Sequence, residues 1–236
     1  MVNFYNMKTT KAKLLLAITQ YSEVIIWGPV KHGQGYWIPF YFDFRGLISI
    51  PKLRKIFVNA LVDKIHKYKI DLILGAETAG ISWAAMVAHE LNKPCSYVRK
   101  AKKKSMTHRS TEGIFKAGTS AVLVDDTILF GQTKKLMIEA AGQEGLVVRR
   151  IVTLYSSNYK SVAGSAFAKW LKQKNITFEG LVTGQDLIKA FIKVGILNDQ
   201  MMELRNMYLK DPYHWHKKIR ARELLLELKR LKKRYG

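Results

Sequence analysis

The sequence predicts an α/β protein whose parallel sheet is flanked by helices on both faces. Between residues 71 and 194, short apolar segments alternate with segments of helical periodicity. The apolar segment 121–124 is hydrophobic at every position instead of every second one. Strands of this kind, spaced by helices, are typical of a parallel sheet that is buried on both faces. Ligands collect at the carboxyl ends of such strands, so the loops there are the candidate sites.

The predicted elements follow one another in a regular order. Thr9 and Thr10 can cap a first helix. A short strand at 24–27, a glycine-rich turn and an aromatic stretch at 36–44 come next, and Pro51 opens a helix that runs to about residue 69. Beyond it we expect strands at 71–74, 95–98, 121–124, 147–154 and 177–182, and helices at 80–91, 133–141, 165–174 and 185–194.

The composition argues against several classes of protein. The 236 residues contain no apolar run long enough for a membrane span, and the first residues lack the apolar stretch of a secretory signal. A single cysteine excludes an internal disulfide. We therefore expect a cytoplasmic protein that has no membrane partner.

The chain is strongly basic, with 40 Lys and Arg against 18 Asp and Glu and a net charge of +22. Such a balance attracts polyanions, which include nucleic acids, acidic membranes and phosphorylated metabolites. The basic residues concentrate at 99–109 and 217–234. The second segment predicts an amphipathic helix whose apolar face contains Ala221, Leu224, Leu225, Leu228, Leu231 and Tyr235. We favour packing of this face on a partner subunit; a solvated basic face and a nucleic-acid surface are the alternatives.

Two adjacent carboxylates follow the apolar segment 121–124. Adjacent acids at a strand end cost repulsion and desolvation, so Asp125 and Asp126 require a compensating ligand such as a vicinal diol or a diol-bound metal ion. Residues 127–133 then supply Gly131, two threonine hydroxyls and the start of a helix, whose free amides form an anion site. This order suits the hydroxyls and the 5′-phosphate of a phosphorylated ribose. An exposed acidic turn is the alternative.

Several motifs together resemble the type I phosphoribosyltransferases and, among them, the orotate phosphoribosyltransferase family. AVLVDDTILFGQT (121–133) is similar to the family's signature for phosphoribosyl pyrophosphate (PRPP). VKHG (30–33) is similar to the family's segment with a lysine that contacts the pyrimidine, and YFDFRGLISIPKL (41–53) is similar to its Tyr-x-Asp-x-Arg-Gly segment. LILGAETAG (72–80) resembles the family's pyrophosphate-binding turn, and VRKAKKK (98–104) resembles its catalytic loop. Several motifs in the right order are more specific than any one alone.

The resemblance implies a fold and an activity. The fold is a type I phosphoribosyltransferase-like domain at 1–196, in which about residues 1–50 form a hood, followed by a basic helical extension at 197–236. The activity is the Mg²⁺-dependent transfer of the 5-phosphoribosyl group from PRPP to a pyrimidine base, converting orotate to orotidine 5′-phosphate and releasing pyrophosphate. In the family the catalytic loop, residues 99–113 here, reaches into a neighbouring subunit's site, so a homodimer is implied.

The resemblance also implies roles for individual residues. Asp125 and Asp126 hold the ribose hydroxyls, and with Lys103 they are the catalytic residues. The implied PRPP site comprises Glu77, Thr78, Ala79, Gly80, Arg99, Lys100, Lys103, Asp125, Asp126, Thr127, Ile128, Leu129, Phe130, Gly131, Gln132 and Thr133. Lys31 and Leu129 occupy base-binding positions. Mg²⁺ is held mainly by PRPP and water, without direct ligation by side chains.

Three places depart from the family's pattern. Ser105 and Met106 stand where the catalytic loop has His-Gly, and His108 is either a substitute catalytic residue or an exposed loop histidine. Leu129 replaces a threonine that contacts orotate. Residues 153–161 lack the arginine that grips the orotate carboxylate in the family, which weakens the prediction of orotate as the base.

Two other functions therefore stay open. One is a phosphoribosyltransferase for another nucleobase. The other is a non-catalytic PRPP- or RNA-binding regulator with the same fold, which the net charge of +22 favours. The basic Arg99, Lys100 and Lys103 together with the acidic pair favour an enzyme instead, so nucleic acid is not the preferred partner.

Overall fold

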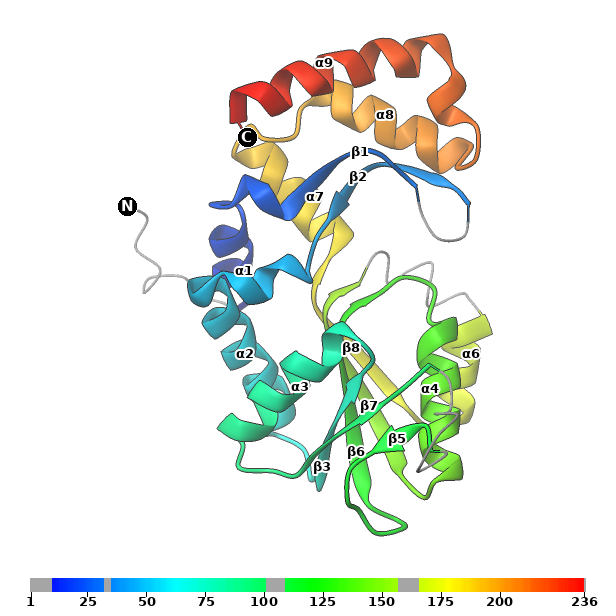
Figure 1. Cartoon of the computed structure of the whole chain (residues 1–236). Helices are drawn as coiled ribbons and strands as arrows, with labels where there is room; N and C mark the ends of the chain where they lie inside the picture. The colour runs from blue at the N-terminus through cyan, green and yellow to red at the C-terminus, as the bar shows by residue number, and fades with distance from the viewer. Residues whose placement is uncertain (1–9, 32–34, 101–108, 157–165, 236) are drawn as a thin grey trace. The chain divides into compact units, whose positions relative to one another are not determined.

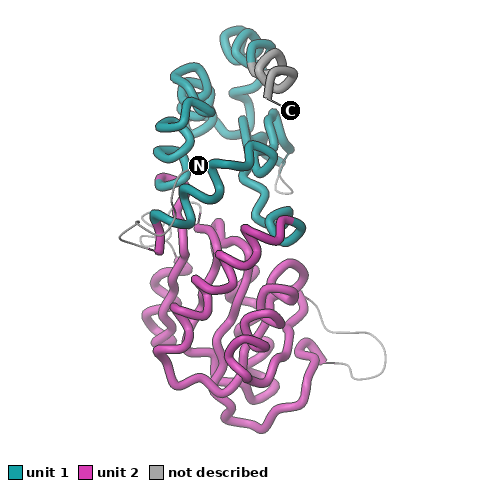
Figure 2. Tube along the Cα trace, turned by 90° about the vertical axis from the view of Figure 1, so that its left-hand side faces the viewer, with its two compact units in different colours: residues 1–8, 12–49, 186–236 teal, residues 9–11, 50–185 magenta. Residues whose placement is uncertain are grey.

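The computed structural model describes residues 10–31, 35–100, 109–156 and 166–235, with side chains up to residue 227 in the last helix. The fold is α/β, as predicted (Figure 1). The chain folds into two compact units (Figure 2). Unit 1 comprises residues 1–8, 12–49 and 186–236, and unit 2 comprises residues 9–11 and 50–185.

The described part of unit 2 contains a six-stranded sheet in the order β5-β4-β3-β6-β7-β8 (Figure 1). The strands are β3 (Leu72–Ala76), β4 (Cys95–Val98), β5 (Thr111–Glu112), β6 (Ser120–Ile128), β7 (Val147–Ser156) and β8 (Thr177–Thr183). All pairs are parallel except β4 with β5. The five predicted strands are confirmed. The sequence does not reveal β5, because two residues carry no hydrophobic pattern of their own.

Helices cover both faces of this sheet (Figure 1). α2 (Pro51–Ile65) and α3 (Ala79–Glu90) lie on one face, and α4 (Gln132–Gln143) and α6 (Ala166–Gln173) lie on the other. Leu123 of β6 belongs to the core that contains Met137 of α4 and Trp170 of α6. Its neighbours Val122 and Val124 are also fully buried. Because both faces of β6 are covered, residues 121–124 are apolar without alternation.

Strand β6 extends beyond its predicted end at residue 124. The additional residues pair with β7, where Asp125 lies opposite Thr153 and Thr127 lies opposite Tyr155. The two acids therefore lie inside the strand, not in the loop after it. A strand end that depends on pairing with a distant segment is not visible in local sequence.

The described part of unit 1 is built on the antiparallel pair β1 (Ile25–Lys31) and β2 (Trp37–Phe42). Its other elements are α1 (Thr10–Ile18), the 3₁₀ turns η2 (Ser22–Val24), η3 (Gly46–Ser49) and η4 (Trp215–Lys217), α7 (Gly184–Lys193), α8 (Asp199–Lys210) and α9 (Ile219–Tyr235). The first residues of α1 and α7 are grouped with unit 2. Helix α8 packs on β2, and α9 packs on α8 and β1.

Trp215 fastens the C-terminal segment to β2. Its side chain is fully buried, and its indole N–H donates to the Trp37 carbonyl at 2.8 Å. The Trp37 N–H in turn donates to the Pro212 carbonyl at 3.2 Å. Residues far apart in the chain thus form one local structure. The expected boundary between residues 196 and 197 lies inside unit 1 and stays a prediction.

The described part of the apolar face of α9 is covered by the chain itself. Ala221, Leu224 and Leu225 are buried in unit 1. For these residues the interpretation that the face packs on a partner subunit is wrong, because α8, η4 and β1 occupy that side of the helix. Among the described residues, no helix is long and apolar enough to cross a membrane.

Replacing Trp215 by Ala should lower the free energy of unfolding by about 3–5 kcal/mol, because a buried aromatic side chain and its hydrogen bond are lost. Urea denaturation followed by circular dichroism measures the loss. Ile219→Ala is the matched control, since Ile219 is 77% exposed at the start of α9. Equal effects of the two substitutions would contradict the packing role of Trp215.

Candidate active site

The two predicted acids lie near the carboxyl end of β6 and are almost fully buried, with exposed fractions of 2% for Asp125 and 3% for Asp126. Asp125 Oδ1 accepts the N–H of Asp126 at 2.8 Å, and Asp126 Oδ1 accepts the N–H of Thr127 at 2.7 Å. The Thr127 hydroxyl also donates to Asp126 Oδ1 at 3.3 Å. The alternative of an exposed acidic turn is therefore wrong.

Lys134 supplies charge compensation inside the protein. Its ammonium group, in the first turn of α4, forms an ion pair with Asp125 Oδ2. Burial raises the pKa of Asp125 above its usual value; Lys134 opposes this shift, and the charge of Asp126 adds to it. Sequence reasoning missed Lys134, although its place in the first turn of the following helix was a usable signal.

The loop after β6 has the geometry of an anion site. Gly131 has a φ of +84° and immediately precedes α4, and a Cβ there would overlap the Phe167 ring. The first amides of a helix have no partner within it, so the start of α4 offers N–H donors and the positive end of the helix dipole. Leu129 is half-buried and Phe130 is 48% exposed, so this loop presents hydrocarbon at both positions.

The predicted pyrophosphate turn approaches the acids closely. Strand β3 ends at Ala76, and α3 begins at Ala79 after a cis peptide bond between Glu77 and Thr78. A Cβ on Gly80 would overlap the Val124 carbonyl and lie 2.9 Å from Asp125 Oδ1. Glycine is therefore needed at residue 80 for the turn to lie against the end of β6. The adjacent parallel strands bring these two predicted segments together.

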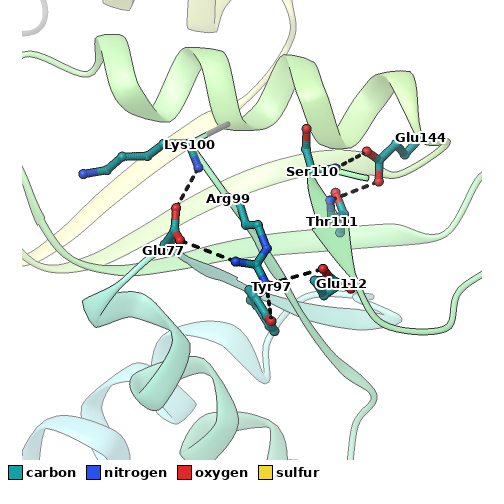
Figure 3. A network of polar contacts seen from close by, with 8 residues as sticks. All are labelled: Glu77, Tyr97, Arg99, Lys100, Ser110, Thr111, Glu112 and Glu144. Carbon is teal, nitrogen blue, oxygen red and sulfur yellow. Dashed lines mark hydrogen bonds and ion pairs between the residues drawn. The ribbon is translucent and has the colours of Figure 1, made fainter. Parts of the chain in front are cut away.

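Arg99 joins the pyrophosphate turn to the base of the predicted catalytic loop (Figure 3). Its guanidinium lies 3.8 Å from Glu77 Oε1 and 3.4 Å from Glu112 Oε1, and it donates to the Tyr97 hydroxyl at 3.0 Å. Glu77 Oε2 accepts the N–H of Lys100 at 3.0 Å. Arg99 and Lys100, for which the resemblance implies contacts with pyrophosphate, thus both contact the Glu77 carboxylate of the turn.

Glu144 closes the base of the same loop from the other side (Figure 3). Its carboxylate accepts the N–H of Ser110 at 2.6 Å and that of Thr111 at 3.1 Å. The N–H of Arg99 donates to the Ser110 carbonyl at 2.7 Å, continuing the pairing of β4 with β5. Both ends of the segment 99–113 are therefore held by the sheet and by the end of α4.

Other predicted site residues fall outside the described part of unit 2. Lys103, His108, Ser105 and Met106 lie outside the described residues. Lys31 lies on β1 in unit 1, where its ammonium is 6.0 Å from the centre of the Trp37 ring. The roles assigned to these residues stay predictions.

A phosphoribosyl transferase domain model matches residues 49–182 of the chain, which include the acids, the turn and the loop base. The chain belongs to the phosphoribosyltransferase family. It is 30% identical over 190 residues to the orotate phosphoribosyltransferase of Phocaeicola vulgatus, covering 79% of this chain and 87% of that protein. It is 28% identical to the orotate phosphoribosyltransferase of Coxiella burnetii, covering 89% of this chain and 99% of that one.

Solved structures share the fold of this phosphoribosyltransferase. The UMP synthase of Leishmania donovani superposes with a TM-score of 0.69 at 24% identity, covering 84% of this chain. The chain spans 43% of the length of that protein. The orotate phosphoribosyltransferase of Aeropyrum pernix superposes with a TM-score of 0.62 at 22% identity, covering 78% of this chain and 99% of that one. The predicted fold class and family are thereby confirmed.

Gly131→Ala should destabilise the protein by about 2 kcal/mol or more and weaken PRPP binding, because it adds left-handed strain and an overlap with Phe167. Gly118→Ala is the matched control: Gly118 has a φ of +85°, but a Cβ there meets no atom within 4 Å. Thermal unfolding and calorimetric titration with PRPP measure both effects. Equal losses in the two variants would contradict the close approach of Phe167.

Glu144→Ala should speed amide hydrogen exchange at Ser110 and Thr111 by about tenfold or more, because both N–H groups lose a charged acceptor. Exchange measured by mass spectrometry on peptides covering residues 109–113 reports the change. Glu139→Ala on the same helix is the control, since Glu139 pairs with Lys135 at 3.9 Å on the helix surface. Unaltered exchange in Glu144→Ala would show that this carboxylate does not hold the loop base.

Proposed function

We propose that the protein transfers the 5-phosphoribosyl group of PRPP to orotate, forming orotidine 5′-phosphate and releasing pyrophosphate. The observation that carries the proposal is the buried pair Asp125 and Asp126 between a Gly80 turn and a Gly131 helix start. Orotate phosphoribosyltransferases align with most of the chain, which supports orotate as the base. We infer that the reaction takes place in the cytoplasm.

The proposed roles follow from the chemistry of each group. Asp125 and Asp126 accept hydrogen bonds from the ribose 2′ and 3′ hydroxyls, since ionised carboxylates are strong acceptors. The amides at the start of α4 bind the 5′-phosphate. The turn 77–80 holds the pyrophosphate, and its position beside Asp125 suits the short distance between the ribose and its leaving group. These contacts orient the anomeric carbon toward the base.

Departure of pyrophosphate requires positive charge where negative charge builds up. We assign this role to Lys103 and Lys100, with His108 as a further catalytic residue of the loop. Arg99 contributes after exchanging its contact with Glu77 for pyrophosphate, because the 3.8 Å ion pair is partly exposed and weak. Exclusion of water from the activated sugar would also favour transfer to the base over hydrolysis.

The site suits Mg²⁺ bound through the substrate. The oxygen donors at the end of β6 are the kind that Mg²⁺ prefers, and the ion usually keeps several waters and substrate phosphates as ligands. Bound there, Mg²⁺ would neutralise charge on the pyrophosphate. Asp125 and Asp126 would face it through the ribose hydroxyls or water. We further propose a homodimer in which the loop 99–113 completes the partner's site.

The choice of base depends on side chains that differ from the family's pattern. We place Lys31 and Leu129 beside it. Leu129 offers no hydroxyl, and residues 153–156 of β7 contain no arginine. Another nucleobase is therefore the second candidate substrate. Because the net charge is +22, an RNA-binding regulator is the third candidate function. An affinity for RNA that falls with salt, without any turnover, would favour this function.

The test is pyrophosphate release from PRPP and Mg²⁺ with a panel of orotate, uracil, adenine, guanine and hypoxanthine. We expect turnover with orotate. Asp126→Asn should lower kcat/KM for PRPP by about a hundredfold, because a charged acceptor of the ribose is lost. Asp63→Asn on the exposed side of α2 is the matched control and should keep full activity. Turnover with another base alone would replace orotate, and PRPP binding without any turnover would contradict an enzymatic function.

A further inference from the structure

Lys134 occupies an unusual place for a lysine. It lies in the first turn of α4, where the helix dipole disfavours a positive charge. Its side chain is nevertheless only 12% exposed. The next residue, Lys135, is 44% exposed and pairs with Glu139 on the helix surface. Burial of one lysine against the dipole requires a specific compensating anion, and Asp125 is that anion.

Among the described residues, the charged groups that act on Asp125 are Asp126 and Lys134. Asp126 is the next residue on β6, and the Lys134 ammonium pairs with Asp125 from α4. On the side of α3, Gly80 lies close to Asp125 and carries no charge. The neighbour on β7 is Thr153, whose hydroxyl donates to the Tyr155 carbonyl. With both acids ionised, Lys134 reduces a double negative charge to a single one.

We propose that Lys134 is a positioning residue of the ribose site, which holds Asp125 as an oriented carboxylate ready to accept ribose hydroxyls. Asp125 Oδ1 is fixed by the N–H of Asp126, and Oδ2 is fixed by the Lys134 ammonium. Both oxygens are thereby held before the substrate arrives. The inference rests on the proposed function for its substrate, whereas the coupling of Lys134 to Asp125 belongs to the protein itself.

Removal of the ammonium should weaken binding and folding together, but the two losses should change with pH in opposite directions. Burial already raises the pKa of Asp125; without Lys134 that pKa rises further. A group whose folded-state pKa is raised contributes stability at low pH that is lost as the pH rises through that pKa. Hydrogen bonding to the ribose needs the ionised form, so PRPP binding improves over the same range of pH.

The experiment compares Lys134→Met with Lys135→Met, which removes the same charge from the adjacent surface position. PRPP affinity is measured by calorimetry, and stability by urea unfolding, at pH 6, 7.5 and 9. In Lys134→Met we expect PRPP binding about tenfold weaker at neutral pH, with the deficit larger at pH 6 and smaller at pH 9. The loss of stability should instead grow from pH 6 to pH 9. Lys135→Met should match the unmodified protein in both.

A Lys134→Met deficit in PRPP binding that does not change with pH, or a match to Lys135→Met, would overturn the proposal. If Lys134→Met folds poorly, the proposal is tested with two further variants, Asp125→Asn and the double variant Asp125→Asn/Lys134→Met. The double variant should be more stable at pH 9 than Lys134→Met, because no buried charge is left unpaired. If the unmodified protein binds no PRPP, the proposed function fails, while the pH dependence of unfolding still decides whether Lys134 controls Asp125.

Discussion

The buried pair of adjacent carboxylates at the end of β6 is the constraint on which the rest of the site depends. Two neighbouring negative charges in the interior are unfavourable unless they are bound and compensated. Backbone amides of the strand, the Thr127 hydroxyl and the Lys134 ammonium provide this compensation from β6 and α4. The turn at Gly80 lies close against Asp125, and Gly131, with its left-handed backbone, directly precedes α4.

A second set of contacts holds the two ends of the loop 99–113 in place. Arg99 connects the loop to Glu77 of the turn, and Glu144 connects the loop's far end to α4. The loop base is thus linked to both halves of the proposed PRPP site. A displacement of the turn 77–80 would therefore also move the start of the loop, since the Glu77 carboxylate contacts both Arg99 and the N–H of Lys100.

The basic C-terminal segment has a structural role within unit 1. Ala221, Leu224 and Leu225 are buried by the same chain, and the Trp215 indole donates a hydrogen bond to the first residue of β2. Arg220 illustrates how the charged side is arranged, since it pairs with Glu203 of α8 at 3.0 Å. Part of the strong positive charge therefore serves to join helices. Exposed pairs of this kind contribute little stability, so the buried face holds the segment in place.

The sequence by itself determined the α/β class, the five main strands and the acids, because hydrophobic periodicity and adjacent carboxylates are local features. It also supported the family through motifs in the correct order. Only the tertiary structure decided that β6 continues through Asp125, that β5 exists, and that Lys134 faces the acid. The same holds for Ala221, Leu224 and Leu225 of α9, which are buried within their own unit. These features depend on which distant segments meet, and ion pairs and strand ends formed by such meetings leave no periodic signal in the chain.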